Sequence, residues 1–198
     1  RDLSESGGLD LWVSDGTAQG TVVLTALVPG RTGNVGSLTA AGDRLFFSLA
    51  DVDRGEELWV SDGTAEGTAF VKDIYPGPGG SEPSRHSFPV ATDDSVFFGA
   101  TDPEHGDELW VSDGTAEGTQ LLCEVVPGTG GSNPEHFRVA GSHLFFTAQT
   151  LEHGRQLWSV PIDVSPAAEF ALTPEGCSRA RTVELDASGS STPEGTAI

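Results

Sequence analysis

Apolar residues in this chain come in short runs separated by turns that contain glycine and aspartate, which predicts strands rather than helices. Three equivalent runs carry a Phe-Phe or Val-Phe-Phe core and are expected to be strands, at residues 44–49, 95–100 and 143–148. Each is followed by a second run built on Leu-Trp, and both kinds of run are apolar at consecutive positions. Strands of this kind need cover on both faces of their sheet. The pattern therefore predicts about four short strands per repeat and sheets that pack face to face.

The second of these runs belongs to a repeated string, LWVSDGTA-x-GT, found at residues 11–21, 58–68 and 109–119, with a decayed copy, LWSVPID, that begins at Leu157. All the tryptophans of the chain lie in it, roughly 50 residues apart, namely Trp12, Trp59, Trp110 and Trp158. We expect an all-β array of four-stranded antiparallel blades of the β-propeller type, in preference to a solenoid. The units are predicted as a partial one at 9–28, blades at 35–76 and 86–127, and a last blade at 136–162 without its fourth strand.

The Asp-Gly pair of the string predicts a tight turn, because glycine tolerates a positive φ and the carboxylate can accept hydrogen bonds from nearby backbone N–H groups. The pairs are Asp15-Gly16, Asp62-Gly63 and Asp113-Gly114. Calcium binding by these loops is the alternative, but they lack the ligand density of a dedicated calcium loop. The tryptophans have apolar flanks, so we expect them in the core between blades; a platform that stacks on sugars is the other interpretation.

With Glu57 and Glu108 in front, the string reads ELWVSDGT at residues 57–64 and 108–115, and the chain resembles the bacterial ELWxxDGT-repeat family at these positions. Asp10 and Gln156 replace the glutamate in the first and fourth copies. The segment VKDIYPG and the two GGS-x-P stretches, at 79–83 and 130–134, are similar to the spacer of that family. The resemblance covers residues 1–163 and implies a secreted or surface-exposed repeat protein, with no general activity and no catalytic residues.

Residues 164–198 form the predicted second region, a linker followed by a truncated β-sandwich. The alternating segment TVELD at 182–186 and the ASGSS turn after it resemble the first strands of a PKD-type immunoglobulin-like domain. That resemblance implies that Cys177 has lost a partner further along such a domain, and a Cys123–Cys177 disulfide is the alternative. Because an open array of so few blades leaves apolar end faces in water, we expect these 198 residues to be a fragment. Further blades of a longer chain, or a second chain, would then close the ring.

The charge balance excludes some partners. Lys and Arg total 10 against 30 Asp and Glu, a formal charge of −20. Such a surface repels nucleic acids and anionic membranes. The chain also lacks a run of about 18 apolar residues, the length that a membrane-spanning helix needs. We therefore expect no nucleic acid partner and no membrane insertion, while an acidic surface would attract cations such as calcium.

Two acidic loops are the better calcium candidates, Asp51-x-Asp53 and Asp102-x-Glu104, each a fixed distance before a glycine. The equivalent positions in the first and last units lose one or both carboxylates, which fits optional surface charge equally well. Metalloprotease, nucleophile-elbow and P-loop motifs are absent from the sequence. The sequence therefore indicates no catalytic residue, no cofactor other than calcium, and no enzyme.

The function expected from these features is a non-catalytic binding or scaffolding module of a secreted or cell-surface protein, with its blade loops presented to a protein or glycan partner. An accessory domain of an extracellular hydrolase, with the catalytic part elsewhere, is the first alternative. A calcium-stabilised structural spacer is the second.

Overall fold

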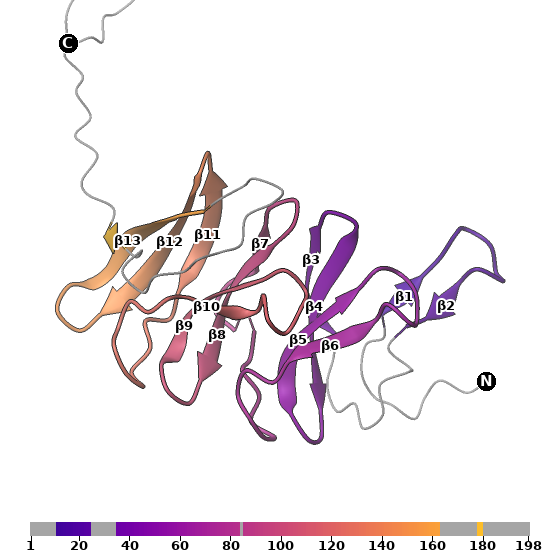
Figure 1. The fold of residues 1–198 in the computed structure, drawn as a ribbon, viewed down its shortest axis with the longest axis horizontal. Coiled ribbons are helices and arrows are strands. Elements are labelled where there is room, and N and C mark those ends of the chain that lie inside the picture. The colour runs from indigo at the N-terminus through magenta and orange to yellow at the C-terminus, as the bar shows by residue number, and fades with distance from the viewer. Residues whose placement is uncertain (1–10, 25–34, 84, 163–177, 180–198) are drawn as a thin grey trace, which may run out of the picture.

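The computed structural model describes residues 11–24, 35–83, 85–162 and 178–179, and every regular element among them is a β-strand. The strands form a two-stranded sheet and three four-stranded sheets, all antiparallel, that follow one another along the long axis of the molecule (Figure 1). The first sheet contains β1 (Trp12–Val13) and β2 (Val22–Val23). The second contains β3 (Gly36–Ala41), β4 (Arg44–Asp51), β5 (Gly55–Ser61) and β6 (Ala69–Lys72).

The third and fourth sheets repeat this plan. The third contains β7 (Val90–Ala91), β8 (Val96–Asp102), β9 (Gly106–Ser112) and β10 (Gln120–Cys123). The fourth contains β11 (Glu135–Ala140), β12 (His143–Thr150), β13 (Gly154–Pro161) and β14 (Ser178–Arg179). The all-β class and the four short antiparallel strands of the middle repeats are as predicted, while the described sheets do not close into a ring (Figure 1).

The fourth sheet differs from the sequence prediction, which left it without its fourth strand. Ser178 pairs with Ser159 and Arg179 with Trp158, so β14 covers the edge of β13. The prediction was wrong because the repeat pattern ends at Pro161, and a strand of two residues carries no pattern of its own. Apart from these two residues, the segment that resembles a PKD-type domain lies outside the described residues.

The core consists of clusters that lie between successive sheets. In β5 the neighbours Leu58 and Trp59 point to opposite faces, as alternation along a strand requires, so Leu58 joins the cluster shared with the third sheet and Trp59 the cluster shared with the first. Trp110 packs in the same way against the second sheet, among Phe46 and Leu58. The consecutive apolar positions of the sequence are thus explained by sheets that are covered on both sides.

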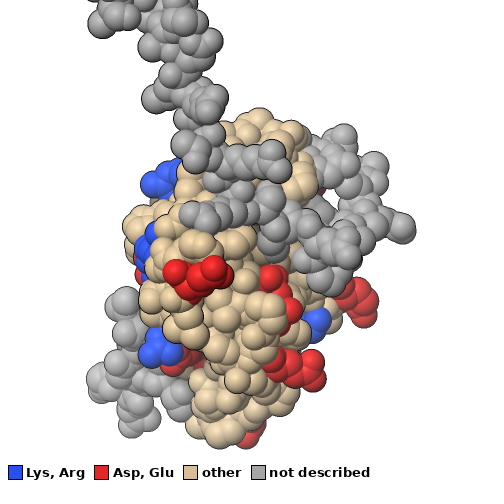
Figure 2. Space-filling view, turned by 90° about the vertical axis from the view of Figure 1, so that its left-hand side faces the viewer, with Lys and Arg blue, Asp and Glu red and all other residues tan. Residues whose placement is uncertain are grey.

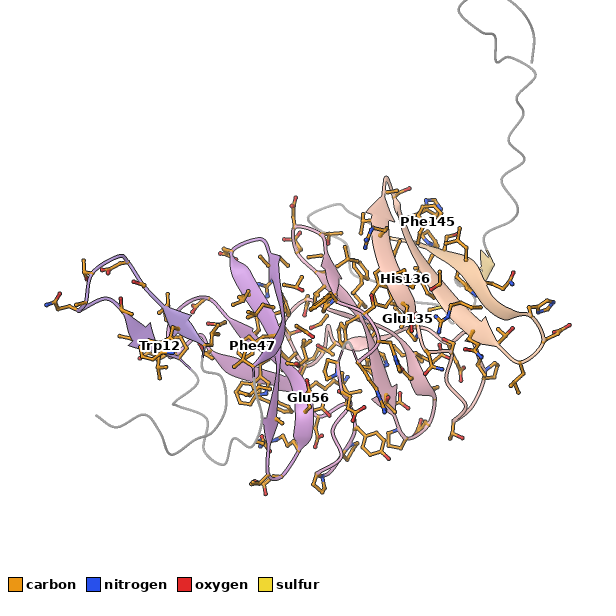
Figure 3. All side chains as sticks on the ribbon, turned by 180° about the vertical axis from the view of Figure 1, so that it is seen from behind. Trp12, Phe47, Glu56, Glu135, His136 and Phe145 are labelled. Carbon is orange, nitrogen blue, oxygen red and sulfur yellow. The ribbon has the colours of Figure 1, made fainter. Side chains whose placement is uncertain are left out.

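Both ends of this stack carry aromatic residues of the repeat. Trp12 lies on the first sheet and Phe145 on the fourth, toward opposite ends of the molecule (Figure 3). Seen from the end formed by the fourth sheet, acidic side chains are scattered over the surface and basic ones lie mainly along one side (Figure 2). Among the described residues, no helix is long and apolar enough to cross a membrane.

Cys123 ends β10 and is 1% exposed. It is disulfide-bonded. The sequence contains two cysteines, and the other, Cys177, lies outside the described residues. The two alternatives stated from the sequence concern Cys177, so the structure shows only that Cys123 is bonded.

Candidate functional site

The Asp-Gly loops form self-contained turns in all three copies. Asp62 Oδ1 accepts hydrogen bonds from the backbone N–H of Thr64 at 2.8 Å and from its hydroxyl at 2.7 Å. These bonds, the hydroxyl one foremost, lower the pKa of Asp62. Gly63 has a φ of 88°, and a Cβ on Gly67 would lie 2.0 Å from the Asp62 carboxylate. The same bonds join Asp15 to Thr17 and Asp113 to Thr115, so these aspartates have turn-capping partners within their own loops.

The tryptophans of the motif lie mainly between sheets. Trp59 and Trp110 are each 7% exposed, and Trp158 is partly buried against the cluster of the third and fourth sheets. Trp59 and Trp110 are too buried to present a ring face to a sugar, whereas Trp158 also lines the pocket between the third and fourth sheets. Trp12, on the outer face of the first sheet, is the exception at 48% exposed.

The four calcium candidates do not converge. Asp51 Oδ1 accepts hydrogen bonds from the backbone of Asp53 and Arg54, and Asp51 Oδ2 pairs with the Arg54 guanidinium at 2.7 Å. Asp102 does the same with the backbone of Glu104 and His105 and with the imidazole of His105. Within the described ranges, no group of three or more His, Cys, Asp or Glu side chains is placed to hold a metal ion. The geometry of Asp51 and Asp102 is that of turn caps.

Two buried glutamates were not expected from the sequence to have a specific role. Glu57 and Glu108 are 0% exposed. Glu57 Oε1 accepts the backbone N–H groups of Tyr75 and Ser81, and Oε2 accepts the Ser81 hydroxyl. Burial raises the pKa of Glu57 to about 7, although these hydrogen bonds act to lower it.

Glu108 repeats the arrangement one sheet later. It accepts hydrogen bonds from the backbone of Val125 and Val126 and from the Ser132 hydroxyl, and burial raises its pKa to about 7 as well. Each glutamate therefore holds the linker that leads from its own sheet to the next. A signal was present in the sequence: the two repeats in which Glu leads the motif are also the two that contain the serine of GGS-x-P.

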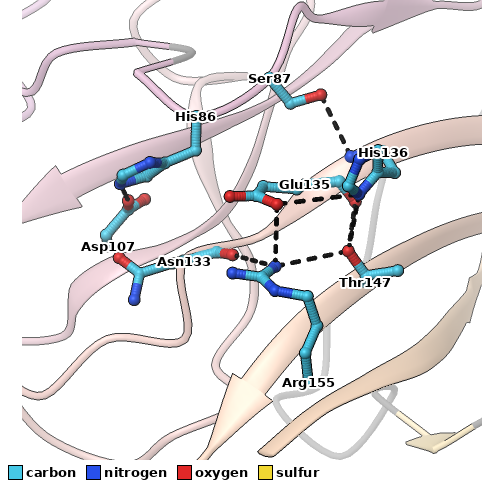
Figure 4. A network of polar contacts seen from close by, with 8 residues as sticks. All are labelled: His86, Ser87, Asp107, Asn133, Glu135, His136, Thr147 and Arg155. Atoms are coloured by element: carbon cyan, nitrogen blue, oxygen red, sulfur yellow. Dashed lines mark hydrogen bonds and ion pairs between the residues drawn. The ribbon is translucent and has the colours of Figure 1, made fainter.

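A polar network lies where the linkers enter the first strands of the third and fourth sheets (Figure 4). Arg155 Nη1 lies 3.2 Å from Glu135 Oε2 and donates hydrogen bonds to the Asn133 carbonyl and the Thr147 hydroxyl. His136 Nδ1 lies 3.0 Å from the same hydroxyl and 3.7 Å from Glu135 Oε2. The His136 backbone N–H donates to Ser87 Oγ, which joins the two sheets.

A second ion pair lies on the third sheet beside this network. His86 Nε2 is 3.3 Å from Asp107 Oδ2 (Figure 4). Burial raises the pKa of Asp107, and the nearby His86 and Arg85 oppose that rise. Asp107 and Arg155 occupy equivalent positions, each directly after the first glycine of its strand, β9 or β13. One position of the repeat thus supplies a carboxylate to one sheet and a guanidinium to the next.

The backbone is bent at this place. His136 has a φ of 61° and Asn133 a φ of 48°, values that residues other than glycine seldom adopt. Ser37, at the equivalent bulge of β3, and Glu82, in the equivalent linker, share the conformation. The bends therefore belong to the repeat, and the sequence did not reveal them because no glycine marks them.

The network offers hydrogen-bonding groups but no catalytic relay. Thr147 and Glu135 approach the same ring nitrogen of His136, whereas a Ser-His-Asp type triad needs the two nitrogens to contact different partners. The His136 side chain is 71% exposed and that of Arg155 34%. Phe88, next to Ser87, is 79% exposed. Donors and acceptors are therefore exposed at this place, and an exposed aromatic residue directly follows Ser87 in the chain, which suits binding.

A pocket of about 420 Å³ lies between the end of the third sheet and the β12–β13 turn. Its walls are mainly apolar, and its lining residues include Val125, Val126, Pro127, Leu151 and Trp158. The size is within the range of small-molecule sites. Glu152 and His153, also in the lining, lie 3.7 Å apart and supply its charged groups.

Comparison with known proteins identifies no family for this chain. No family model matches the chain, and no curated protein matches it. Among solved structures, a puromycin-hydrolyzing peptidase of Mycobacterium tuberculosis is similar at 13% sequence identity and a TM-score of 0.42, over 87% of this chain and 27% of that chain. The chain thus spans about a quarter of the length of that peptidase, and a likeness this weak carries no argument about activity.

Proposed function

We propose that this chain is a non-catalytic binding module of a secreted or cell-surface protein, and that its sheets are blades of a propeller-type array. The packing of the sheets supports their assignment as blades. Each middle sheet packs Leu and Phe against the sheet that follows and Trp against the sheet that precedes, and the first strands β3, β7 and β11 are neighbours along one side of the stack. Sheets that pack face to face around an axis have these features.

The observation that carries the binding function is the Arg155–Glu135–His136 network beside the exposed Phe88. A carboxylate, a guanidinium and an imidazole in fixed positions can accept and donate hydrogen bonds to the hydroxyl groups of a glycan or the backbone of a peptide. The aromatic ring supplies an apolar contact next to them. Because Arg155 already has three oxygen partners, it is held in place before a ligand arrives.

The disulfide of Cys123 supports the location outside the cytosol, since disulfides persist in oxidising compartments and are rare in the cytosol. The contacts of His136 support the absence of a catalytic relay in this network, because the Thr147 hydroxyl and the Glu135 carboxylate approach the same ring nitrogen, so the carboxylate does not hold the ring from its other side.

The test is a glycan array and a peptide array probed with the wild-type chain, with Arg155→Gln and Phe88→Ala, and with Arg54→Gln as a matched control. Arg54 pairs with Asp51 inside its own turn and takes no part in the network. We expect ligands whose signal falls at least tenfold in the first two variants and stays unchanged in the control. Binding that all three variants retain would contradict the assignment of the site.

A further inference from the structure

The interfaces inside the stack use the same pairs of positions each time. Between the second and third sheets, Phe46 and Leu58 meet Phe98 and Trp110. Between the third and fourth sheets, the equivalent residues Phe97 and Leu109 meet Phe146, and Trp158 packs against that cluster. Every sheet therefore has two different faces, which we call the Phe-Leu face and the Trp face. In both of these interfaces a Phe-Leu face packs against a Trp face.

The outermost faces of the described stack are one of each kind. The first sheet ends the stack with Trp12, which is 48% exposed, whereas its equivalents Trp59 and Trp110 are 7% exposed. The fourth sheet ends the stack with Leu157, which is 50% exposed, whereas Leu58 and Leu109 are 2% and 0% exposed. Trp12 and Leu157 thus occupy positions that are buried in the middle sheets. Large apolar residues exposed at such positions indicate end faces that another sheet would cover.

The surroundings of Leu157 are more polar than those of its buried equivalents. Ser159 replaces Val60 and Val111, and Arg138 replaces Thr39 and Val90, as the strand registers show. Phe145 is partly exposed and contacts the His143 ring. Figure 2, which looks onto this end of the molecule, shows uncharged residues over much of the described surface, with acidic side chains among them. Apolar and polar residues thus share this face, a composition found in interfaces between separate chains.

Basic residues also cross the internal interface. From the second sheet, Arg44 donates to the Asp113 carbonyl and Lys72 donates to the Thr119 carbonyl, so both bind the Asp-Gly loop of the third sheet. His143 occupies the position of Arg44 on the fourth sheet, since each pairs with the last alanine of its first strand. The Asp-Gly loop of the first sheet, which begins at Ser14, carries the same carbonyl groups for such a donor.

We propose that these two end faces bind one another between two copies of this chain, with the Trp12 face of one copy on the Leu157 face of the other. The contact is head-to-tail, so two copies that close on each other form two identical interfaces. Three four-stranded sheets and one two-stranded sheet from each copy then make eight sheets, a number within the range of blades found in closed propellers. The proposal does not depend on the glycan or peptide site, because it uses other residues.

The first measurement is sedimentation equilibrium of the whole chain across a concentration series. We expect a reversible change from the 20.6 kDa chain to about twice that mass. Trp12→Ala and Leu157→Asp should each raise the dissociation constant at least tenfold, as expected of residues at the centre of an interface. Leu151→Asp is the control, because Leu151 is fully exposed on the β12–β13 turn and lies outside both faces. Circular dichroism verifies that each variant is folded.

The second measurement separates head-to-tail contact from contact between like faces. In a mixture of Trp12→Ala and Leu157→Asp chains, one of the two interfaces contains only unsubstituted faces. We therefore expect the mixture to form dimers at concentrations where either variant alone stays monomeric. A chain that remains monomeric throughout, a dimer that neither substitution weakens, or a mixture no more associated than its components would overturn the proposal. Assemblies whose mass continues to rise above that of two chains as the concentration increases would contradict closure into a dimer.

Discussion

The buried glutamates predict an unusual dependence of stability on pH. Folding raises the pKa of Glu57 from 4.5 to about 7. A carboxyl whose pKa is higher in the folded chain binds its proton more tightly there, so its contribution to stability is complete below about pH 4.5 and is lost as the pH rises to about 7. Glu108 has the same shift. Each carboxyl should contribute on the order of 3 kcal/mol across this interval.

The substitution Glu57→Gln tests this contribution directly. The backbone N–H groups of Tyr75 and Ser81 approach Oε1, the Ser81 hydroxyl binds Oε2, and the backbone of Ile74 is a further hydrogen-bond partner of the carboxyl. A glutamine can keep its oxygen on the Tyr75 and Ser81 N–H groups and donate from its nitrogen to Ser81 Oγ, as the protonated acid would. We expect Glu57→Gln to change the free energy of unfolding by less than about 1 kcal/mol at pH 4.5, where the wild-type carboxyl is protonated. At pH 8 the variant should be the more stable protein, by up to about 3 kcal/mol.

Glu108→Gln is the matched comparison. Here the two backbone donors are divided, with Val126 on Oε1 and Val125 on Oε2. A glutamine must turn its nitrogen toward one of these N–H groups, which then lacks an acceptor at a cost of about 1–3 kcal/mol at every pH. Glu108→Gln should therefore be less stable than wild type at pH 4.5.

The assay is urea unfolding followed by tryptophan fluorescence between pH 4.5 and 8, with the difference between variant and wild type taken at each pH. Differences remove the general gain that an acidic chain makes from reduced self-repulsion at low pH. A Glu57→Gln difference that stays constant over this range, or that shows the variant losing stability at pH 8, would refute the reasoning.

Three further predictions use other parts of the molecule. Trp110→Ala should lower the free energy of unfolding by about 3–5 kcal/mol because it empties a space between two sheets, and Leu151→Ala, at a fully exposed site, should leave it unchanged in the same urea titration. Reduction of the Cys123 disulfide should cost about 2–4 kcal/mol, seen as a lower midpoint with dithiothreitol than without it; equal midpoints would show that the bond does not restrain the fold. EDTA should leave the melting temperature unchanged, because Asp51 and Asp102 already bind donors of their own turns; a calcium-dependent rise that Asp51→Asn and Asp102→Asn abolish would contradict this.

The repeat made much of the fold predictable from the sequence. Consecutive apolar positions such as Leu58-Trp59 required sheets covered on both faces, and the structure has them. The strand β14 was not predictable, because a strand of two residues carries no apolar pattern of its own. Each sheet follows local patterns, but closure of the array depends on the rotation from one sheet to the next, which no local pattern encodes.

The candidate site was less predictable than the fold. Arg155 is distant in the sequence from the adjacent residues Glu135 and His136, and the register of β11 on β12 and β12 on β13 brings them together. The equivalent positions carry unlike residues in the other repeats, such as Asp107 in place of Arg155. Residues that recur in each repeat therefore indicated the turns and the core. They did not indicate the network, because its residues differ from one repeat to the next.

Each buried glutamate holds its linker through hydrogen bonds, an arrangement we call a clamp, and its position in the sequence suggests how the chain grew. Glu57 binds Ser81 and Glu108 binds Ser132, so every clamp has both partners inside one stretch of sequence that ends just before the next sheet. A duplication that copies such a stretch carries a complete clamp and one face of each kind with it. The new sheet then fits between old ones without any change to them, and only the outermost faces need adaptation. Such a protein can lengthen or shorten by whole units, while its variable positions diverge independently from one unit to the next.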